Sequence, residues 1–106
     1  MFKNEKSGGK MKLTVSKEAA VWYKDEMDLE QGDYLQYYVQ LYGGIPTAHP
    51  NYSLGMSIGK EGNIAVKDEV EGITFYFNEE HAWFLKEFDM EVVLEDGDLA
   101  FHFEEK

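Results

Sequence analysis

The chain has 106 residues, 43% of them hydrophobic and 15% aromatic, and its 21 acidic residues against 10 lysines give a formal net charge of −11. This length suits one domain, and the aromatic content excludes a disordered acidic chain. The negative charge and the lack of arginine argue against nucleic-acid binding, and the lack of cysteine excludes disulfides and thiol catalysis. No apolar run is long enough for a membrane helix or a signal peptide, so we expect a cytoplasmic protein.

The first ten residues have no apolar period, and four of them are charged. We expect them to form a disordered leader, followed by a single domain over residues 11–106. Leu13 and Val15 predict a short strand. Ser16 is a good N-cap for a helix over residues 17–27, in which Ala20, Tyr23 and Met27 share one face.

After this helix the hydrophobic period changes to two. Residues 35–41 alternate and predict a strand, which ends at the glycine-rich loop that begins at residue 43. Further strands are expected over residues 52–58, over 64–66 as a brief strand, and over 73–77. Clean alternation favours antiparallel or mixed pairing, because each strand then has one solvated face.

The C-terminal part predicts a short helix and a hairpin. Asn78 can cap a helix whose buried side would contain Ala82, Trp83, Phe84 and Leu85. Asp96-Gly97 is a two-residue turn signal, and counting outward from it places Glu91 opposite His102. The expected fold is therefore mainly β, a small sandwich or partly closed barrel covered by two short helices.

Three segments of the chain resemble, in order, parts of the HesB/IscA-like proteins. LTVSKEAAVWYKDEM is similar to their first strand and helix, YLQYYVQLYGGIPT to their strand before a glycine-rich loop, and GITFYFNEEHAWFLKEFDMEVVLEDGDLAFHF to their last strand, helix and hairpin. The resemblance covers roughly residues 12–103 and is greatest to a cysteine-free, YneR-like branch. It implies the same small β fold.

Family members with cysteines are associated with iron–sulfur cluster assembly, and the resemblance implies one ligand in the glycine-rich loop and a pair near the C-terminus. Here Ile45 stands in the loop, and the chain ends at residues 104–106, where the pair would begin. Isoleucine has no lone pair to offer iron. We therefore expect no cofactor, the alternative being weakly held iron or an iron–sulfur cluster.

The glycine-rich loop is also the expected interaction site. Its glycines allow a close approach of the backbone to a ligand, although a plain connection between strands needs the same glycines. Tyrosine is enriched in the cores of protein interfaces. The expected partner surface consists of Tyr38, Tyr42, Gly43, Gly44, Ile45, His49 and Tyr52.

An alternative site would bind a hard metal through imidazole and carboxylate groups. Its candidate ligands are His49 near the loop, and Glu91 with His102 on the hairpin. For the hairpin residues we favour a solvated face on which His102 relieves repulsion between carboxylates, because runs of charge usually mark such faces and two ligands do not hold a metal.

No Ser–His–Asp arrangement is recognisable, and we do not expect an enzyme. The function expected from the sequence is a non-catalytic, protein-binding or regulatory domain. By analogy with the family, its partner would be a component of iron–sulfur assembly or a regulated metabolic enzyme. The alternatives are a carrier of iron or another hard metal, and a small-molecule pocket beside the helix that contains Trp83.

Overall fold

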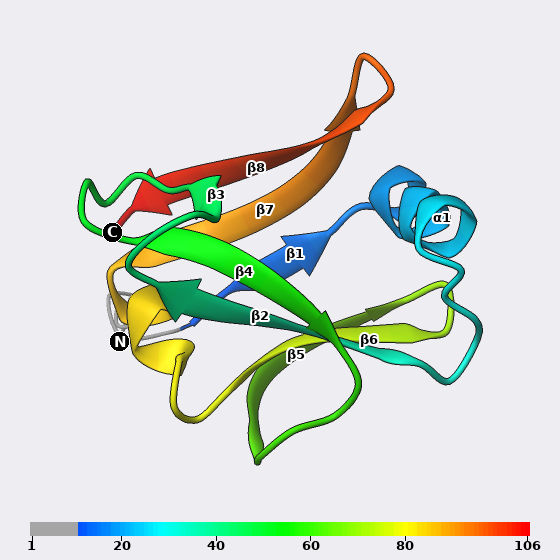
Figure 1. Ribbon diagram of the computed structural model, residues 1–106, viewed down its shortest axis with the longest axis horizontal. Coiled ribbons are helices and arrows are strands. Elements are labelled where there is room, and N and C mark those ends of the chain that lie inside the picture. Colours follow the sequence, from blue (N-terminus) through cyan, green and yellow to red (C-terminus); the bar gives the residue numbers. More distant parts are fainter. Residues whose placement is uncertain (1–10) are drawn as a thin grey trace, which may run out of the picture.

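Two mixed β-sheets form the framework of the computed structural model, which describes residues 11–106 (Figure 1). The predicted leader, residues 1–10, lies outside the described residues. The first sheet has the strand order β1 (Leu13–Val15), β7 (Phe88–Glu95), β8 (Asp98–Glu105). The second has the order β3 (Ile45–Pro46), β4 (Ser53–Ile58), β2 (Tyr34–Gln40), β6 (Ile73–Asn78), β5 (Ile64–Val70).

Both sheets combine parallel and antiparallel neighbours, which confirms the mixed pairing. β1 runs parallel to β7, and β2 runs parallel to β6, whereas the remaining pairs are antiparallel. The hairpin of β7 and β8 has the predicted register, with Glu91 opposite His102 and Glu95 opposite Asp98. The mainly β fold expected from the alternating pattern is therefore confirmed.

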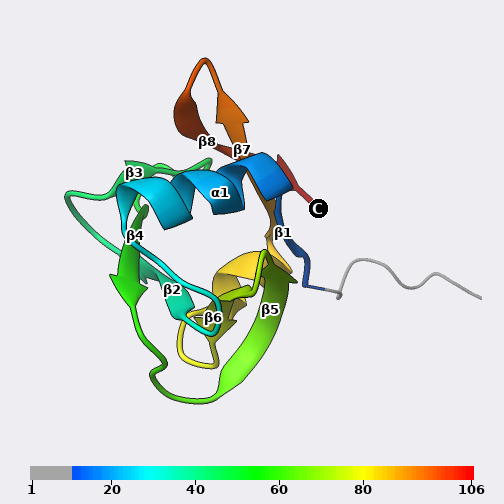
Figure 2. The ribbon, with the colours of Figure 1, turned by 90° about the vertical axis from the view of Figure 1, so that its right-hand side faces the viewer.

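Helix α1 (Lys17–Glu26) begins where the sequence predicts it and packs against β7. The Ser16 hydroxyl accepts a hydrogen bond from the Ala19 N–H at 3.1 Å, which satisfies one of the free donors of the first turn. Ala19, Ala20 and Tyr23 are buried on the inner side of the helix. Turned by 90°, the molecule shows α1 across one end of the space between the two sheets (Figure 2). No helix within residues 11–106 is long and apolar enough to cross a membrane.

A chain of hydrogen bonds between two buried tyrosines and the half-buried Met56 links the helix to the second sheet. The Tyr23 hydroxyl donates to the Met56 Sδ atom at 3.0 Å, and it lies 3.0 Å from the Tyr37 hydroxyl. Because each hydroxyl has one proton, Tyr37 donates to Tyr23. Phe75 packs beside both rings, with centroid distances of 5.0 Å to Tyr23 and 6.4 Å to Tyr37. These contacts join α1, β2, β4 and β6 in one core.

One carboxylate connects the two sheets. Asp68 on β5 accepts a hydrogen bond from the backbone N–H of Val15 on β1 at 2.8 Å. Val15 lies at the edge of the first sheet, so this N–H has no partner strand on that side. The side chain of Asp68 therefore takes the place of a neighbouring strand.

Two of the expected elements differ from the structure. Asn78 does not cap a regular helix: its Oδ1 atom accepts from the N–H groups of Glu80 and His81 in a turn, and a 3-10 helix, η1 (Ala82–Lys86), follows. Trp83 was expected on the buried side but is 37% exposed, because the tighter helix directs only some of its residues into the core.

Strand β5 is longer than the expected residues 64–66. It continues to Val70 because β6 provides a full-length antiparallel neighbour, despite three consecutive charged residues at positions 67–69. Strand β3 was not expected, since the glycine-rich loop has no alternating pattern.

The two buried tyrosines should be energetically coupled. Tyr23→Phe leaves the Tyr37 hydroxyl without its acceptor, and we expect a loss of about 1–3 kcal/mol in the free energy of unfolding. The double variant Tyr23→Phe/Tyr37→Phe removes both hydroxyls and should cost less than the sum of the single changes. Denaturant unfolding of the four proteins measures the coupling, and additive losses would contradict it.

The same pair predicts a loss of stability in alkaline solution. Burial raises the pKa of both Tyr23 and Tyr37 above the ordinary value of 10. The folded chain therefore retains protons on these tyrosines that the unfolded chain releases. The stability contributed by the two protonated tyrosines is fully present below about pH 10 and is lost as the pH rises further. Unfolding measured from about pH 9 to about pH 11 should show a steeper decline for the wild type than for the double phenylalanine variant.

Candidate functional site

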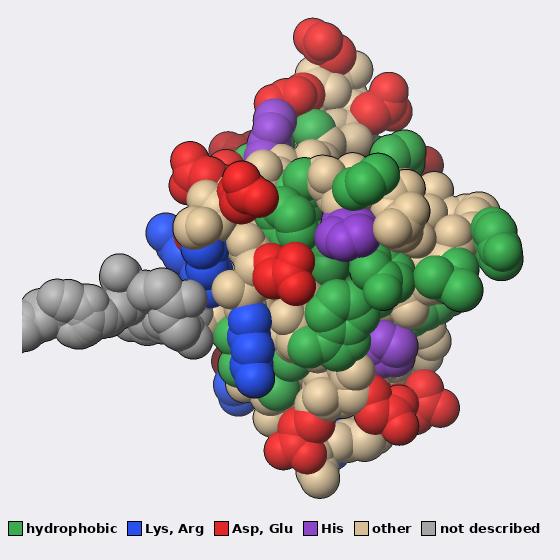
Figure 3. Space-filling model, turned by 90° about the vertical axis from the view of Figure 1, so that its left-hand side faces the viewer, with side chains coloured by type: hydrophobic (Ala, Val, Ile, Leu, Met, Phe, Trp, Pro, Cys, Tyr) green, Lys and Arg blue, Asp and Glu red, His purple; other side chains and the backbone are tan. Residues whose placement is uncertain are grey.

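Exposed and half-buried aromatic and aliphatic side chains gather where the loop of residues 41–52 meets η1. We call this set the aromatic surface; it consists of Leu41, Tyr42, Ile45, His49, Tyr52 and Trp83. Figure 3 views the molecule from the side on which this loop lies and shows hydrophobic side chains across the middle of the face, with histidines among them. Acidic groups lie above, below and to the left of them, and lysines lie at the left.

Ring contacts hold the centre of the aromatic surface together. His49 and Tyr52 lie with ring centroids 4.6 Å apart, and Tyr52 meets Trp83 edge to face at 5.2 Å. Leu41 and Tyr42 are 60% and 84% exposed, far more than large apolar side chains usually are when they serve only the core. The surface thus combines an ordered aromatic centre with apolar groups open to a partner.

The loop that carries these residues is held by its own hydrogen bonds. Thr47 Oγ1 accepts from the His49 N–H at 3.1 Å and donates to the Tyr52 carbonyl at 2.9 Å. His49 Nδ1 accepts from the Asn51 N–H at 3.1 Å. The short strand β3 pairs with β4, with Ile45 opposite Leu54. The loop therefore offers its apolar side chains on a fixed support.

The two glycines of the loop serve different purposes. Gly43 has φ +74°, in the left-handed region that favours glycine, and a side chain there would meet no other atom. At Gly44 a methyl group would overlap the carbonyl of Leu54, so this position needs glycine for space. The sequence analysis identified the glycines but could not separate these two roles.

The structure divides the expected partner surface into two parts. Tyr42, Ile45, His49 and Tyr52 lie on the aromatic surface together with the supporting glycines 43 and 44. Tyr38 instead lies across Gly55 on the outer face of the second sheet, with its ring centroid 6.0 Å from that of His81. It borders a separate polar hollow.

Two members of the aromatic surface were missed by sequence reasoning. Leu41 follows the pattern of a strand, and Trp83 follows the pattern of a buried helix face. The sequence offered one signal for each residue. Leu41 stands directly before the glycine-rich loop, at the end of its strand. Trp83 has three apolar neighbours that suffice to fill the core, which leaves its own ring available for the surface.

The metal candidates are not assembled into one site. Glu91 stands opposite His102 in the hairpin, but His102 Nε2 lies 2.7 Å from Glu95 Oε2, and both side chains of that pair are more than half exposed. His49 belongs to the aromatic surface. Among residues 11–106, no group of three or more His, Asp or Glu side chains is placed to hold a metal ion.

Gly44→Ala should disturb the aromatic surface more than Gly43→Ala does. The first change forces β3 away from β4 and should cost about 1–3 kcal/mol, whereas the second strains only its own backbone and should cost about 1 kcal/mol. Amide hydrogen exchange of residues 45–54 and denaturant unfolding measure the difference. Equal exchange in both variants would show that the close contact with Leu54 does not hold the loop.

Comparisons with known proteins place the chain among bacterial relatives. No protein-family model matches it. It is 36% identical over 89 residues to the pyruvate dehydrogenase inhibitor of Bacillus subtilis (strain 168), a match that covers 83% of this chain and 93% of that protein. It is 26% identical over 90 residues to an uncharacterized protein of Staphylococcus saprophyticus, covering 82% and 91%. The chain belongs to the family of the Bacillus subtilis pyruvate dehydrogenase inhibitor.

Proposed function

We propose that this chain is a non-catalytic regulator that binds a pyruvate dehydrogenase and inhibits it through the aromatic surface. The relationship to the Bacillus subtilis inhibitor, over nearly the whole of both chains, suggests the partner. The observation that carries the proposal is the group of exposed apolar side chains on a hydrogen-bonded loop, headed by Leu41 and Tyr42. The predicted cytoplasmic location is part of this proposal.

The composition of the aromatic surface suits a protein interface. Tyrosine and tryptophan are frequent among the residues that dominate binding energy, because their rings bury large areas at a small cost in conformational entropy. Tyr52 and Trp83 are already ordered against each other. Binding would therefore order mainly Leu41 and Tyr42, which limits the entropy lost on association.

The charge of the chain adds selectivity to this apolar centre. With a net charge of −11, the chain repels acidic proteins and attracts a surface rich in lysine and arginine. Such attraction acts mainly on the rate of association and weakens as salt is added. We therefore infer that the bound face of the enzyme is basic around an apolar depression.

The relation to HesB/IscA-like proteins remains a prediction from the three quoted segments. A partner in iron–sulfur assembly, and the carriage of iron through His49, Glu91 and His102, remain predictions with it. The contacts of these residues favour neither, since His102 pairs with Glu95, and His49 packs on Tyr52.

The proposal predicts inhibition that depends on the aromatic surface. Added to purified pyruvate dehydrogenase of Bacillus subtilis, the chain should lower the rate of pyruvate oxidation in a saturable way. Leu41→Ala and Tyr42→Ala should each raise the concentration needed for half-maximal inhibition about fivefold or more. Both side chains are exposed, so these changes should leave the fold intact.

Ile58→Ala provides a matched control. Ile58 is 55% exposed against 60% for Leu41, and it lies at the other end of β4, away from the loop of residues 41–52. Its replacement removes a similar apolar area and should leave inhibition unchanged. Equal effects of the Leu41 and Ile58 variants would contradict the assignment of the surface, and no inhibition by the wild-type chain would contradict the function.

A further inference from the structure

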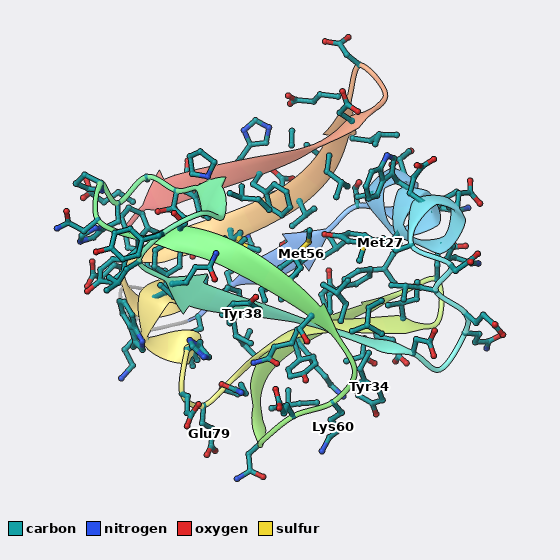
Figure 4. All side chains as sticks on the ribbon, in the orientation of Figure 1. Met27, Tyr34, Tyr38, Met56, Lys60 and Glu79 are labelled. Atoms are coloured by element: carbon teal, nitrogen blue, oxygen red, sulfur yellow. The ribbon has the colours of Figure 1, made fainter. Side chains whose placement is uncertain are left out.

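A polar hollow of about 710 Å³ lies on the outer face of the second sheet. Its floor is formed by Gln36 and Tyr38 on β2 and by Ser57 on β4, which stands directly opposite Gln36. Residues 61–63, after β4, form one wall, and residues 78–81, from the last residue of β6 onward, form the other. Figure 4 labels Tyr38 on β2 and Glu79 beyond β6, from two of the segments that line the hollow.

The side-chain amide of Gln36, on the floor, faces the hollow. Gln36 is only 4% exposed, and its side-chain amide makes no hydrogen bond within residues 11–106. Among residues 11–106 every fully buried side-chain nitrogen or oxygen atom has a hydrogen-bond partner, so the unbonded amide atoms of Gln36 must be reached by solvent. The remaining access of this amide is through the hollow, so a ligand there could satisfy it.

The walls are fixed before any ligand arrives. The hydroxyl of Tyr76 donates to the Gly59 carbonyl at 2.9 Å and accepts from the Glu61 N–H at 2.7 Å, which holds the first wall over the sheet. Asn78 Nδ2 donates to the Glu61 carbonyl at 3.3 Å and connects the two walls. The hollow is therefore part of the fold and does not have to be formed by a ligand.

The charges around the hollow select a cation. Glu61, Glu79 and Glu80 line it, and its lining among the described residues includes no lysine. Lys60 lines a separate hollow of about 180 Å³. The Gln36 carbonyl oxygen can accept a hydrogen bond from a cationic donor, and the carboxylates of the walls can accept others.

The aromatic ring on the floor favours a planar cation. Tyr38 lies across Gly55, where a side chain would collide with the ring, so the glycine keeps the ring close to the sheet. A guanidinium group can stack on such a ring while it donates in its own plane to neighbouring acceptors. An ammonium group, by contrast, is compact and more strongly hydrated.

We propose that this hollow binds a guanidinium group, which donates to the Gln36 side-chain carbonyl and to Glu79 while it stacks on Tyr38. The group can reach the hollow on an arginine side chain of a protein or as free arginine. The site is distinct from the aromatic surface and does not depend on inhibition of pyruvate dehydrogenase.

Nuclear magnetic resonance can test the site directly, with Nα-acetylarginine N-methylamide as the probe. The side-chain NH₂ signals of Gln36 should shift and saturate at millimolar concentrations, while the matching citrulline amide, which is neutral, should cause no saturable shift. Gln36→Ala should weaken binding about tenfold and Glu79→Gln about threefold. The remaining amide spectrum reports whether each variant is folded.

Glu26→Gln, an exposed acidic residue at the end of α1, is the matched control and should bind the probe like the wild type. Stronger binding of the blocked amide than of free arginine would identify a protein side chain as the natural source, and the reverse would identify the free amino acid. Both results support the site. Equal shifts with the citrulline probe, or unchanged binding by both Gln36→Ala and Glu79→Gln, would overturn it.

Discussion

The hydrogen-bond chain from Tyr37 through Tyr23 to Met56 is the interaction on which the rest of the structure depends. It connects the only α-helix within residues 11–106 to two strands of the second sheet, and the two tyrosines are fully buried. Apolar packing alone would leave the helix free to shift along the sheet, because dispersion contacts have little directional preference. The two hydroxyl groups make directional hydrogen bonds, which fix the position of the helix relative to β2 and β4. The strands that they fix, β2 and β4, are also the strands that carry the loop of residues 41–52 and the floor of the polar hollow.

The two candidate sites lie at different parts of these strands, one at the loop that follows β2 and the other on the outer face. Towards the loop, the strands end in exposed apolar side chains suited to a protein partner, whereas Gln36 and Ser57 on their outer face belong to a polar hollow. Tyr38 belongs to the hollow, because the register of β2 and β4 places it over Gly55. One pair of strands can thus bring an apolar contact and a charged contact to neighbouring parts of one partner, or serve two ligands separately.

Much of the fold could be predicted from local patterns. Ser16 as a helix cap, the alternating strands and the Asp96-Gly97 hairpin all rest on contacts within a few residues, and the structure confirms them. The errors concern contacts between distant segments. Trp83 was expected in the core because nothing local distinguishes it from Phe84, and only the crossing of η1 over the sheets decides which ring is covered. The pairing of His102 with Glu95 in place of Glu91 depends on side-chain rotamers. The hollow that Gln36 faces depends on three segments far apart in sequence.

The carboxylate of Asp68 also affects how copies of this chain meet in concentrated solution. By accepting the Val15 N–H, it occupies a donor that would otherwise be available for strand addition from another molecule. The opposite edge of that sheet, β8, ends in Glu104 and Glu105, where two copies placed edge to edge would bring like charges together. The acidity of the chain therefore works against intermolecular sheet growth, so a β protein with a short helical cover can remain dispersed without a dedicated capping element.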